Sequence, residues 1–478
     1  MKSSILFVSV ICLAIPLFAQ ETLSFIAQKD IAAKADELCS TYQAMGWFEG
    51  VILIAQNGKT VFEKAYGLAD HQTGAPNTMQ TKFRIGSINK NYTDILVMQL
   101  VEQGKLSLDQ TLADFELGFP PAVAEKITLR HLMTHTAGFG DIFIPEYLDN
   151  IRAFKDIDDI LPLLLNEPLL YEPGTDQMYS NYGYSVLRAI LEKVSGQSFK
   201  TLLQQQILDV IGAQDTYYDI AEQIQGEAQS YRYTLAGEKV DHTAQLEYPT
   251  PDGGMYATAA DVLRFFKARH FSNKLVSDQS KLAMATDYQE TDLTWEKILN
   301  SPRAVEGSAG GGPGVSALAL TFFKDRYQVI LLANTDQMVT EEIGFRLEQA
   351  MQGKTYAPPT LPPANYLYQI RQQKGDQFLL DNFESIVSQG NLGEPNAMLL
   401  NQIGYDLLYT GNAEEAIAIF ALNVQLFPND ANPYDSLAEA YLESGDREKA
   451  LHYYKKALEI DPDFEPSLMK VKELEGQK

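Results

Sequence analysis

A serine and a lysine stand three residues apart in FRIGSINKNYTDILVMQLVEQ, residues 83–103. Helix-forming residues follow Gly86, so Ser87 and Lys90 are predicted to project from one face of a helix's first turn. The helix N-terminus would direct unpaired N–H groups toward whatever Ser87 attacks. A lysine serves as base for a serine only where its surroundings favour the neutral amine. Alone the spacing is a weak signal, because a serine cap followed by a surface lysine is commoner.

Two later stretches carry groups that would complete such a site. In YSNYGYSVLRAILEKVSG, residues 179–196, Tyr179 could relay a proton and Asn181 could hold both the lysine and a substrate. In EGSAGGGPGVSALAL, residues 306–320, a glycine-rich turn directly precedes a predicted strand. The edge of such a strand can offer a backbone N–H to an oxyanion. These groups predict nucleophilic acyl transfer through serine.

The order of these motifs resembles the serine β-lactamase and penicillin-binding-protein superfamily. The resemblance is strongest to its class C-like branch, which includes D-alanyl-D-alanine carboxypeptidases, D-aminopeptidases and esterases. Two further stretches resemble that branch, ITLRHLMTHTAGFGD at residues 127–141 and PDGGMYATAADVLRFFKA at residues 251–268. The resemblance covers roughly residues 35–350.

The resemblance implies an α+β fold, with an antiparallel sheet flanked by helices, a helical subdomain and the site between them. It implies that Ser87 is the nucleophile and that Lys90 and Tyr179 form the base system. The residues that it assigns to substrate binding are Asn181, Ser308, Gly310 and Gly311, with the backbone N–H groups of Ser87 and Gly311 as oxyanion donors. It implies neither a cofactor nor a metal.

One position departs from the family pattern. Where the family usually has lysine or histidine, then any residue, then glycine, this chain has Ser308-Ala309-Gly310. A cation at that position would pair with a substrate carboxylate, whereas a serine hydroxyl offers a neutral hydrogen bond. Recognition of a β-lactam or D-alanine carboxylate is therefore in doubt, unless Arg303 or another cation substitutes.

Three other patterns in the sequence resemble known sites. His131 and His135 are four apart, as in a zinc protease helix, but Leu132 stands where the general-base glutamate would be. A packing or capping role is therefore favoured over metal binding. The segment THTAG mimics a His-Thr-Gly triad, but no strand pattern follows it. Neither RIGSI nor EGSAG satisfies Gly-x-Ser-x-Gly, so the α/β-hydrolase motif is absent.

The elements that must position these residues come from both ends of a domain over residues 20–355. Residues 27–47 predict a helix, and residues 48–69 predict a hairpin turned at Asn57-Gly58. Helices dominate from Ser87 to about Ile207. A second hairpin is predicted over residues 314–336 and a closing helix over 340–352. Strands at both ends with helices between them favour one antiparallel sheet in an α+β fold.

The remainder of the chain predicts a second domain. Residues 356–365, YAPPTLPPAN, read as a stiff proline-rich linker. Over residues 366–478 a 34-residue shift superposes Gly411 on Gly445 and Ala416 on Ala450, which is typical of tetratricopeptide repeats. Such repeats predict an all-α stack that binds a protein partner or self-associates, with buttressing of the hydrolase as the alternative.

The first nineteen residues, MKSSILFVSVICLAIPLFA, predict a secretory signal peptide cleaved near Ala19–Gln20. The apolar run is short for a membrane span, and no second run follows it. Cys12 would leave with the signal, so Cys39 cannot form an intrachain disulfide. With 38 basic and 63 acidic residues, the net charge of −25 argues against nucleic acid or anionic membrane as partner.

The sequence therefore predicts an exported serine hydrolase, periplasmic or secreted. It would act through an acyl-enzyme on a small-molecule or peptide acyl substrate, which could be a β-lactam, a D-amino-acid peptide or an ester. The alternative from a different class is a non-catalytic protein that captures peptide or glycan in a degenerate site and works through its repeats.

Overall fold

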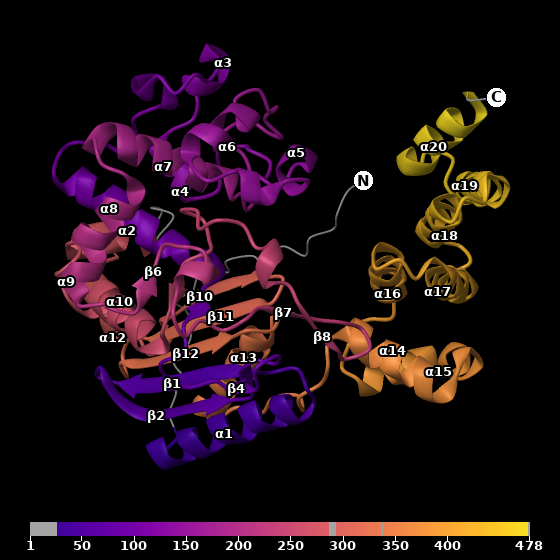
Figure 1. Ribbon diagram of the computed structural model, residues 1–478, viewed down its shortest axis with the longest axis horizontal. Coiled ribbons are helices and arrows are strands. Elements are labelled where there is room, and N and C mark those ends of the chain that lie inside the picture. Colours follow the sequence, from indigo (N-terminus) through magenta and orange to yellow (C-terminus); the bar gives the residue numbers. More distant parts are fainter. Residues whose placement is uncertain (1–25, 286–292, 337, 477–478) are drawn as a thin grey trace. The chain divides into compact units, whose positions relative to one another are not determined.

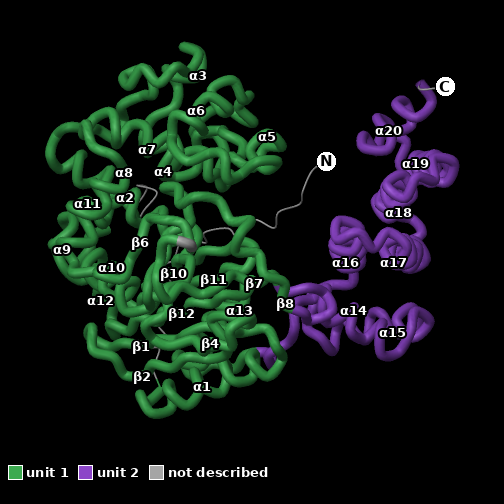
Figure 2. The backbone as a smooth tube through the Cα atoms, in the orientation of Figure 1, with its two compact units in different colours: residues 1–232, 239–356 green, residues 233–238, 357–478 purple. Residues whose placement is uncertain are grey.

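The computed structural model describes residues 26–285, 293–336 and 338–476. The predicted signal peptide, residues 1–19, lies outside the described residues. The chain forms two compact units, coloured separately in Figure 2. The first unit comprises the residues up to Arg232 together with Lys239–Tyr356. The second unit comprises Ala357–Lys478 together with the segment Tyr233–Glu238, which is inserted in the sequence of the first.

The first unit is built on one five-stranded antiparallel sheet (Figure 1). Its strands, in spatial order, are β10 (Val305–Gly312), β11 (Val315–Phe322), β12 (Tyr327–Ala333), β1 (Gly50–Gln56) and β2 (Lys59–Tyr66). Strand β1 pairs with β12, so Leu53 lies opposite Ile330 although 277 positions separate them. The predicted joining of the two ends of the domain in one sheet is confirmed.

Turn chemistry fixes the β1–β2 hairpin. Asn57 and Gly58 have φ angles of 52° and 70°, the two positive values that a two-residue type I′ turn requires. Strands β11 and β12 are buried along their whole length, because alternate side chains point to opposite faces and both faces are covered.

Three helices provide that cover. Helices α1 (Gln28–Ala44) and α13 (Val339–Met351) pack on each other and on the sheet, while α10 (Ala259–Phe271) also packs on β1, β11 and β12. Leu318 lies against α13, whereas its neighbours Ala317 and Ala319 join the core that contains residues of α10. The sheet is therefore the central layer of three.

The helical subdomain follows the first hairpin in sequence. Helix α2 (Asn89–Glu102) and helix α7 (Tyr182–Ser195) supply much of its core, and α7 stops at Gly196, whose left-handed φ of 70° closes the helix. The other short helices are η1 (Gly86–Ile88), η2 (Leu112–Phe115), α3 (Pro121–Ala124), α4 (Leu129–Met133), α5 (Pro145–Leu148), η3 (Ile151–Ala153), α6 (Ile157–Leu164), α8 (Phe199–Leu203), the π-helical turn η4 (Gln204–Leu208), α9 (Asp209–Ile211), η5 (Ala221–Gln223), η6 (Thr243–Gln245), α11 (Asp278–Ala285) and α12 (Trp295–Asn300).

Short strands complete the first unit. They form small sheets of their own: β5 (Phe83–Arg84), β9 (Tyr256–Ala257) and β6 (Thr216–Tyr217) in one, β3 (Leu68–Asp70) with β4 (Ala75–Pro76), and β7 (Tyr231–Tyr233) with β8 (Lys239–Asp241). The β5–β9 pair brings the segment before Ser87 beside the segment that follows Asp252.

The glycine-rich stretch was predicted as a turn before the strand, and this was wrong in detail. Residues 305–312 are themselves the edge strand β10, paired with β11 from Val305 opposite Phe322 to Gly312 opposite Val315. Glycine has a low strand propensity, and the turn falls at Pro313-Gly314. Glycine is required in β10 at Gly310 because the backbone of the Ser87 turn approaches this strand too closely to leave room for a side chain.

The second unit consists of antiparallel helix pairs. They are α14 (Pro363–Lys374), α15 (Asp376–Gln389), α16 (Met398–Tyr409), α17 (Ala413–Leu426), α18 (Ala431–Glu443), α19 (Arg447–Ile460) and α20 (Glu465–Gly476). A Cβ on Gly404 would lie 2.4 Å from Phe420, so the repeat's small residue permits close helix contact. Helix α14 starts inside the predicted linker, because proline suits a first helical position.

The inserted segment Tyr233–Glu238 was not foreseen. Leu235 is buried in the same core as Leu367 and Phe383, and the Asn365 side chain donates to the Thr234 carbonyl at 2.7 Å. Among the residues described, no helix has the length and apolar character needed to cross a bilayer.

Candidate active site

Ser87 lies on the 3₁₀ turn η1, which runs directly into helix α2. Gly86 supplies the left-handed φ of 50° with which this turn begins. Ser87 is half-buried, whereas Lys90 is only 4 % exposed. The serine is therefore accessible at a helix N-terminus while the lysine lies beneath it.

The structure brings Ser87, Lys90, Tyr179 and Asn181 together. The Tyr179 hydroxyl donates to Ser87 Oγ at 2.7 Å. Lys90 Nζ donates to Ser87 Oγ at 3.2 Å, to Asn181 Oδ1 at 2.6 Å and to the Asp252 carbonyl oxygen at 2.8 Å. Three acceptors match the three hydrogens of an ammonium group. Its nitrogen lies 4.8 Å from the centroid of the Tyr179 ring.

The loop around Asp252 is fastened to α2 by consecutive carbonyl groups. Asn89 Nδ2 donates to the Thr250 oxygen at 3.0 Å, and Thr93 Oγ1 donates to the Pro251 oxygen at 2.8 Å. Lys90 takes the next carbonyl, that of Asp252. The carbonyl groups of residues 250–252, which overlap the start of the PDGG motif, thus accept hydrogen bonds from three side chains of α2, a role that the sequence alone did not predict.

A carboxylate stands behind Asn181. Asn181 Nδ2 donates to both oxygens of Asp141, at 3.1 and 3.2 Å. Burial raises the pKa of Asp141 to about 6. Burial also raises the pKa of Asp252, against the opposing effect of Lys90. Asp141 is the last residue of the motif at residues 127–141, and the sequence alone predicts no role for it.

His135 buttresses the tyrosine. Its ring lies 4.6 Å from that of Tyr179, and its Nδ1 accepts the Ser180 N–H at 3.2 Å. Burial, aided by Lys90, lowers the pKa of His135 to about 3, which keeps the ring neutral. His135 has a φ of 57°, so it lies beyond the end of helix α4.

His131 has a different function from His135. It completes a capping box with Thr128 at the start of α4, where its Nδ1 accepts the Thr128 N–H at 3.3 Å. The predicted preference for packing and capping agrees with these contacts. In the part of the chain that the structure describes, no group of three or more histidine, cysteine or acidic residues is arranged to hold a metal ion.

The edge strand β10 touches the nucleophile's turn backbone to backbone. A Cβ on Gly310 would lie 2.2 Å from the Ile85 carbonyl oxygen and 2.7 Å from the Ser87 nitrogen. A Cβ on Gly86 would lie 2.8 Å from the Gly311 nitrogen. The exposed Gly311 therefore adjoins the Ser87 turn, on the edge strand of the sheet.

Ser308 turns inward. Its side chain is 5 % exposed, and its Oγ accepts from Asn91 Nδ2 at 2.6 Å. Arg303 lies two residues before the start of β10 and five residues before Ser308, the position of the family's cation. Its role as a substitute cation stays a prediction.

Charged groups behind Ser308 pair with each other. Glu306 binds Arg269 and His270. Burial raises the pKa of Glu306, but Arg269 and His270 outweigh it and hold that pKa well below its usual range. Below Lys90 on α2, Asp94 accepts from the Tyr184 hydroxyl at 3.0 Å, and burial raises its pKa to about 7.

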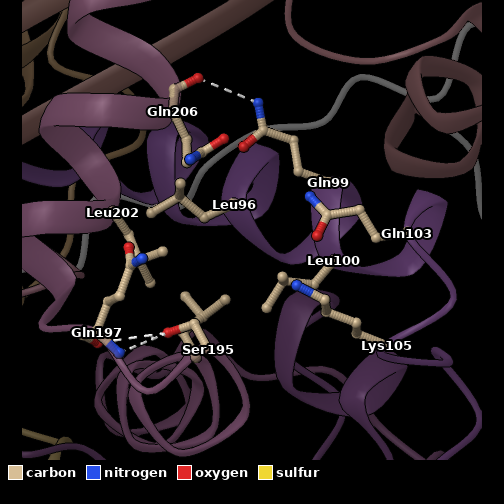
Figure 3. A pocket seen from close by; sticks show the side chains of 10 residues that line it. Leu96, Gln99, Leu100, Gln103, Lys105, Ser195, Gln197, Leu202 and Gln206 are labelled. Atoms are coloured by element: carbon tan, nitrogen blue, oxygen red, sulfur yellow. Dashed lines mark hydrogen bonds between the residues drawn. The ribbon is translucent and has the colours of Figure 1, made fainter.

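A separate pocket lies at the far end of α2 from Ser87 (Figure 3). It has a volume of about 80 Å³. Gln99 Nε2 donates to the backbone carbonyl oxygen of Gln206 at 3.2 Å, and leucine side chains lie beside this contact. Its lining residues are Leu96, Gln99, Leu100, Gln103, Lys105, Leu191, Ser195, Gln197, Leu202 and Gln206. None of the groups predicted to do chemistry is among them.

Comparison with known proteins now decides the family. Residues 35–347 match the family model described as Beta-lactamase, and residues 396–463 match the model described as Tetratricopeptide repeat. The chain belongs to the Beta-lactamase family. The family, the fold class and the repeats predicted from the sequence are confirmed, and with them the assignment as a serine hydrolase of the β-lactamase, penicillin-binding-protein and esterase type.

This Beta-lactamase family member is similar to several characterised proteins. Penicillin-binding protein 4* of Bacillus subtilis is 26 % identical over 358 residues, covering 69 % of this chain and 78 % of that protein. Esterase EstB of Burkholderia gladioli is 29 % identical over 255 residues, covering 46 % of this chain and 64 % of EstB. The octameric penicillin-binding-protein homologue from Pyrococcus abyssi shares the fold, with a TM-score of 0.60 and 22 % identity over 72 % of this chain and 81 % of that one.

Proposed function

We propose that this protein is an exported serine hydrolase that forms an acyl-enzyme on Ser87. One observation carries the proposal: Ser87 Oγ lies 2.7 Å from the Tyr179 hydroxyl and 3.2 Å from Lys90 Nζ, at a helix N-terminus. Both distances are within reach for general-base catalysis. Export rests on the signal-like residues 1–19.

In the proposed reaction, Ser87 Oγ attacks the carbonyl carbon of an ester or amide. The reacting form is the one in which the Lys90–Tyr179 pair has lost one proton. The serine proton passes to that pair, and the negative charge on the carbonyl oxygen is stabilised by the N–H groups of Ser87 and Gly311. Collapse of the tetrahedral intermediate breaks the bond to the leaving group, which takes up the proton. Water then attacks the acyl-serine, aided by the same pair, and restores the free hydroxyl.

The substrate we propose is an acyl donor without a free carboxylate. Ser308 replaces the family's cation and is itself engaged by Asn91, so a carboxylate beside Gly311 would have no cation from this position. The relatives fit an ester substrate, since they include an esterase and the teichoic acid D-alanine hydrolase of Staphylococcus aureus. A D-alanyl ester therefore belongs in the substrate panel.

For the second unit we propose binding of a partner polypeptide or of a second copy. The support is the match to tetratricopeptide repeats together with exposed side chains on α16, where Met398 and Tyr409 are 64 % and 60 % exposed. Tyr409 stacks on Tyr405, whose hydroxyl donates to Glu439 of α18 at 2.8 Å. Exposed aromatic groups beside carboxylates suit a cationic segment of a partner.

A fluorescent phosphonate tests the proposed chemistry. Wild-type protein should be labelled and should hydrolyse p-nitrophenyl acetate, and Ser87→Ala should abolish both. Equal labelling of the two proteins, or absence of labelling by phosphonate and penicillin probes alike, would favour the alternative of a binding protein without turnover. Detection of the mature N-terminus at Gln20 in the exported fraction would test the localisation.

A further inference from the structure

Three side chains of complementary hydrogen-bonding character lie in a row beneath Ser87: Lys90, Asn181 and Asp141. We propose that Asp141 is a positioning residue, which fixes the orientation of the Asn181 amide and through it holds Lys90 beneath Ser87. This inference rests on the proposed function of Ser87 and Lys90, and it gives a role to the last residue of the THTAGFGD segment.

Donor and acceptor chemistry permits one arrangement of the row. An ammonium group has only donors, an ionised carboxylate has only acceptors, and an amide has one end of each kind. Asn181 Oδ1 accepts from Lys90 at 2.6 Å, while its Nδ2 donates to Asp141 at 3.1 and 3.2 Å. A flipped amide would set donor against donor at Lys90 and acceptor against acceptor at Asp141. Asp141 therefore selects the orientation that Lys90 needs.

The carboxylate is itself held in place. Its Oδ1 accepts the backbone N–H of Ile142 at 2.7 Å. The preceding residue, Gly140, accepts from Ser180 Oγ at 2.6 Å, which ties this loop to the start of α7. Asn181 is 6 % exposed and immediately precedes that helix. Both ends of the Asn181–Asp141 contact are thus fixed by neighbouring backbone.

The row is sensitive to pH in one direction. Two charged groups face Asp141, Lys90 from α2 and Asp252 from the loop at residues 250–254. Burial and Asp252 raise the Asp141 pKa, the hydrogen bonds from Asn181 and the Ile142 N–H lower it, as does Lys90, and the result is about 6. Below that pH one carboxyl oxygen carries a proton, so Asp141 no longer accepts from Asn181 Nδ2 through both oxygens and selects the amide orientation less strongly. The rate of Ser87 acylation should therefore fall as the pH decreases through about 6.

A reciprocal exchange of side chains tests the row. The probe is a fluorescent phosphonate, and the readout is the labelling rate of the full chain at pH 8. Asp141→Ala should reduce the rate about 10- to 100-fold, as expected for misplacement of a reacting group by about 1 Å. Asp141→Asn should reduce it less and remove the change near pH 6. Asn181→Asp alone places two carboxylates together and should also be slow.

The double variant Asp141→Asn with Asn181→Asp restores the order of donors and acceptors, because the new carboxylate faces Lys90 and the new amide donates to it. We expect it to be labelled at least about tenfold faster than the product of the single effects predicts. Rates that multiply without coupling, or single variants that keep the wild-type rate and pH profile, would overturn the proposal.

Denaturant unfolding of the same four proteins gives a readout that does not depend on catalysis. The two exchanges should stabilise each other in the free energy of unfolding. If wild-type protein is not labelled at all, the proposed function fails, but the unfolding measurements still test the role of Asp141. Coupling between the two exchanges in the free energy of unfolding would support that role, and additive effects would refute it. Should Asn181→Asp fail to fold alone, a folded double variant is itself evidence of coupling, and an unfolded one counts against the row.

Discussion

Replacement of Gly310 by alanine tests whether contact between β10 and the Ser87 turn builds the site. The new Cβ would lie 2.2 Å from the Ile85 carbonyl oxygen, whereas ordinary contact begins at 3.4 Å. The strand and the turn must therefore separate by about 1 Å, because both opposing groups are backbone and neither can rotate away. Misplacement of that size costs about 10²-fold in rate.

The chain offers a matched control two residues further along. Gly312 lies on the same strand and has an ordinary φ, and a Cβ there would meet nothing within 4 Å. Both residues are glycines, so both substitutions reduce the freedom of the unfolded chain equally. Gly312→Ala should keep the wild-type rate of phosphonate labelling, while Gly310→Ala should lose about 10²-fold.

The assay compares labelling rates at saturating probe with circular dichroism and melting temperature for all three proteins. A folded Gly310→Ala protein with the wild-type labelling rate would refute the claim that this backbone contact positions Gly311 beside Ser87. Equal losses in Gly310→Ala and Gly312→Ala would show instead that any side chain at these glycine positions of β10, not the contact with the Ser87 turn, causes the effect.

Four further outcomes are expected. Lys90→Ala should lower the acylation rate about 10²-fold or more, as for a removed general base, measured by phosphonate labelling. Ser308→Lys should increase the rate of hydrolysis of carboxylate-bearing substrates about tenfold to a hundredfold. If the wild-type protein already prefers these substrates to their carboxylate-blocked analogues, the reasoning from Ser308 is wrong. Because the pKa of Glu306 is lowered in the folded protein, its ionised form contributes stability at pH values above its usual pKa, and this contribution is lost as the pH falls toward the lowered pKa. Glu306→Gln should therefore lower the free energy of unfolding, measured in urea, by about 3 kcal/mol at pH 7 and by less at pH 4. An equal decrease at both pH values would contradict this. Truncation after Tyr356, combined with Leu235→Ser to cover the loss of its packing partners, should keep ester hydrolysis and abolish association seen by light scattering; a folded but inactive truncation would show that the repeats help build the site.

Local patterns predicted the elements that depend on local chemistry. The Asn57-Gly58 turn, the helix that carries Lys90 and the 34-residue repeat each follow from residues that are close in sequence. The order of the motifs, not their individual strength, pointed to the family that the comparisons confirm.

Features that depend on distant contacts were missed. Asp141 has an evident role only once its carboxylate is seen against Asn181, 40 positions away. Strand β10 could not be predicted from its own residues because glycine is a poor strand former. Glycine occurs at Gly310 because the backbone of residues 85–87 leaves no room for a side chain. Likewise nothing in Tyr233–Glu238 suggested that it joins the second unit, since one buried leucine carries no periodicity.

That inserted segment has a consequence for synthesis on the ribosome. Leu235 is made roughly 130 residues before Leu367, with which it shares a core, and at the usual rate of about 5–20 residues per second this is a delay of about 7 to 26 s. For that interval the segment has emerged while the helices that bury it do not yet exist. The nascent chain therefore carries Leu235 without its packing partners until the helices of the second unit have been made.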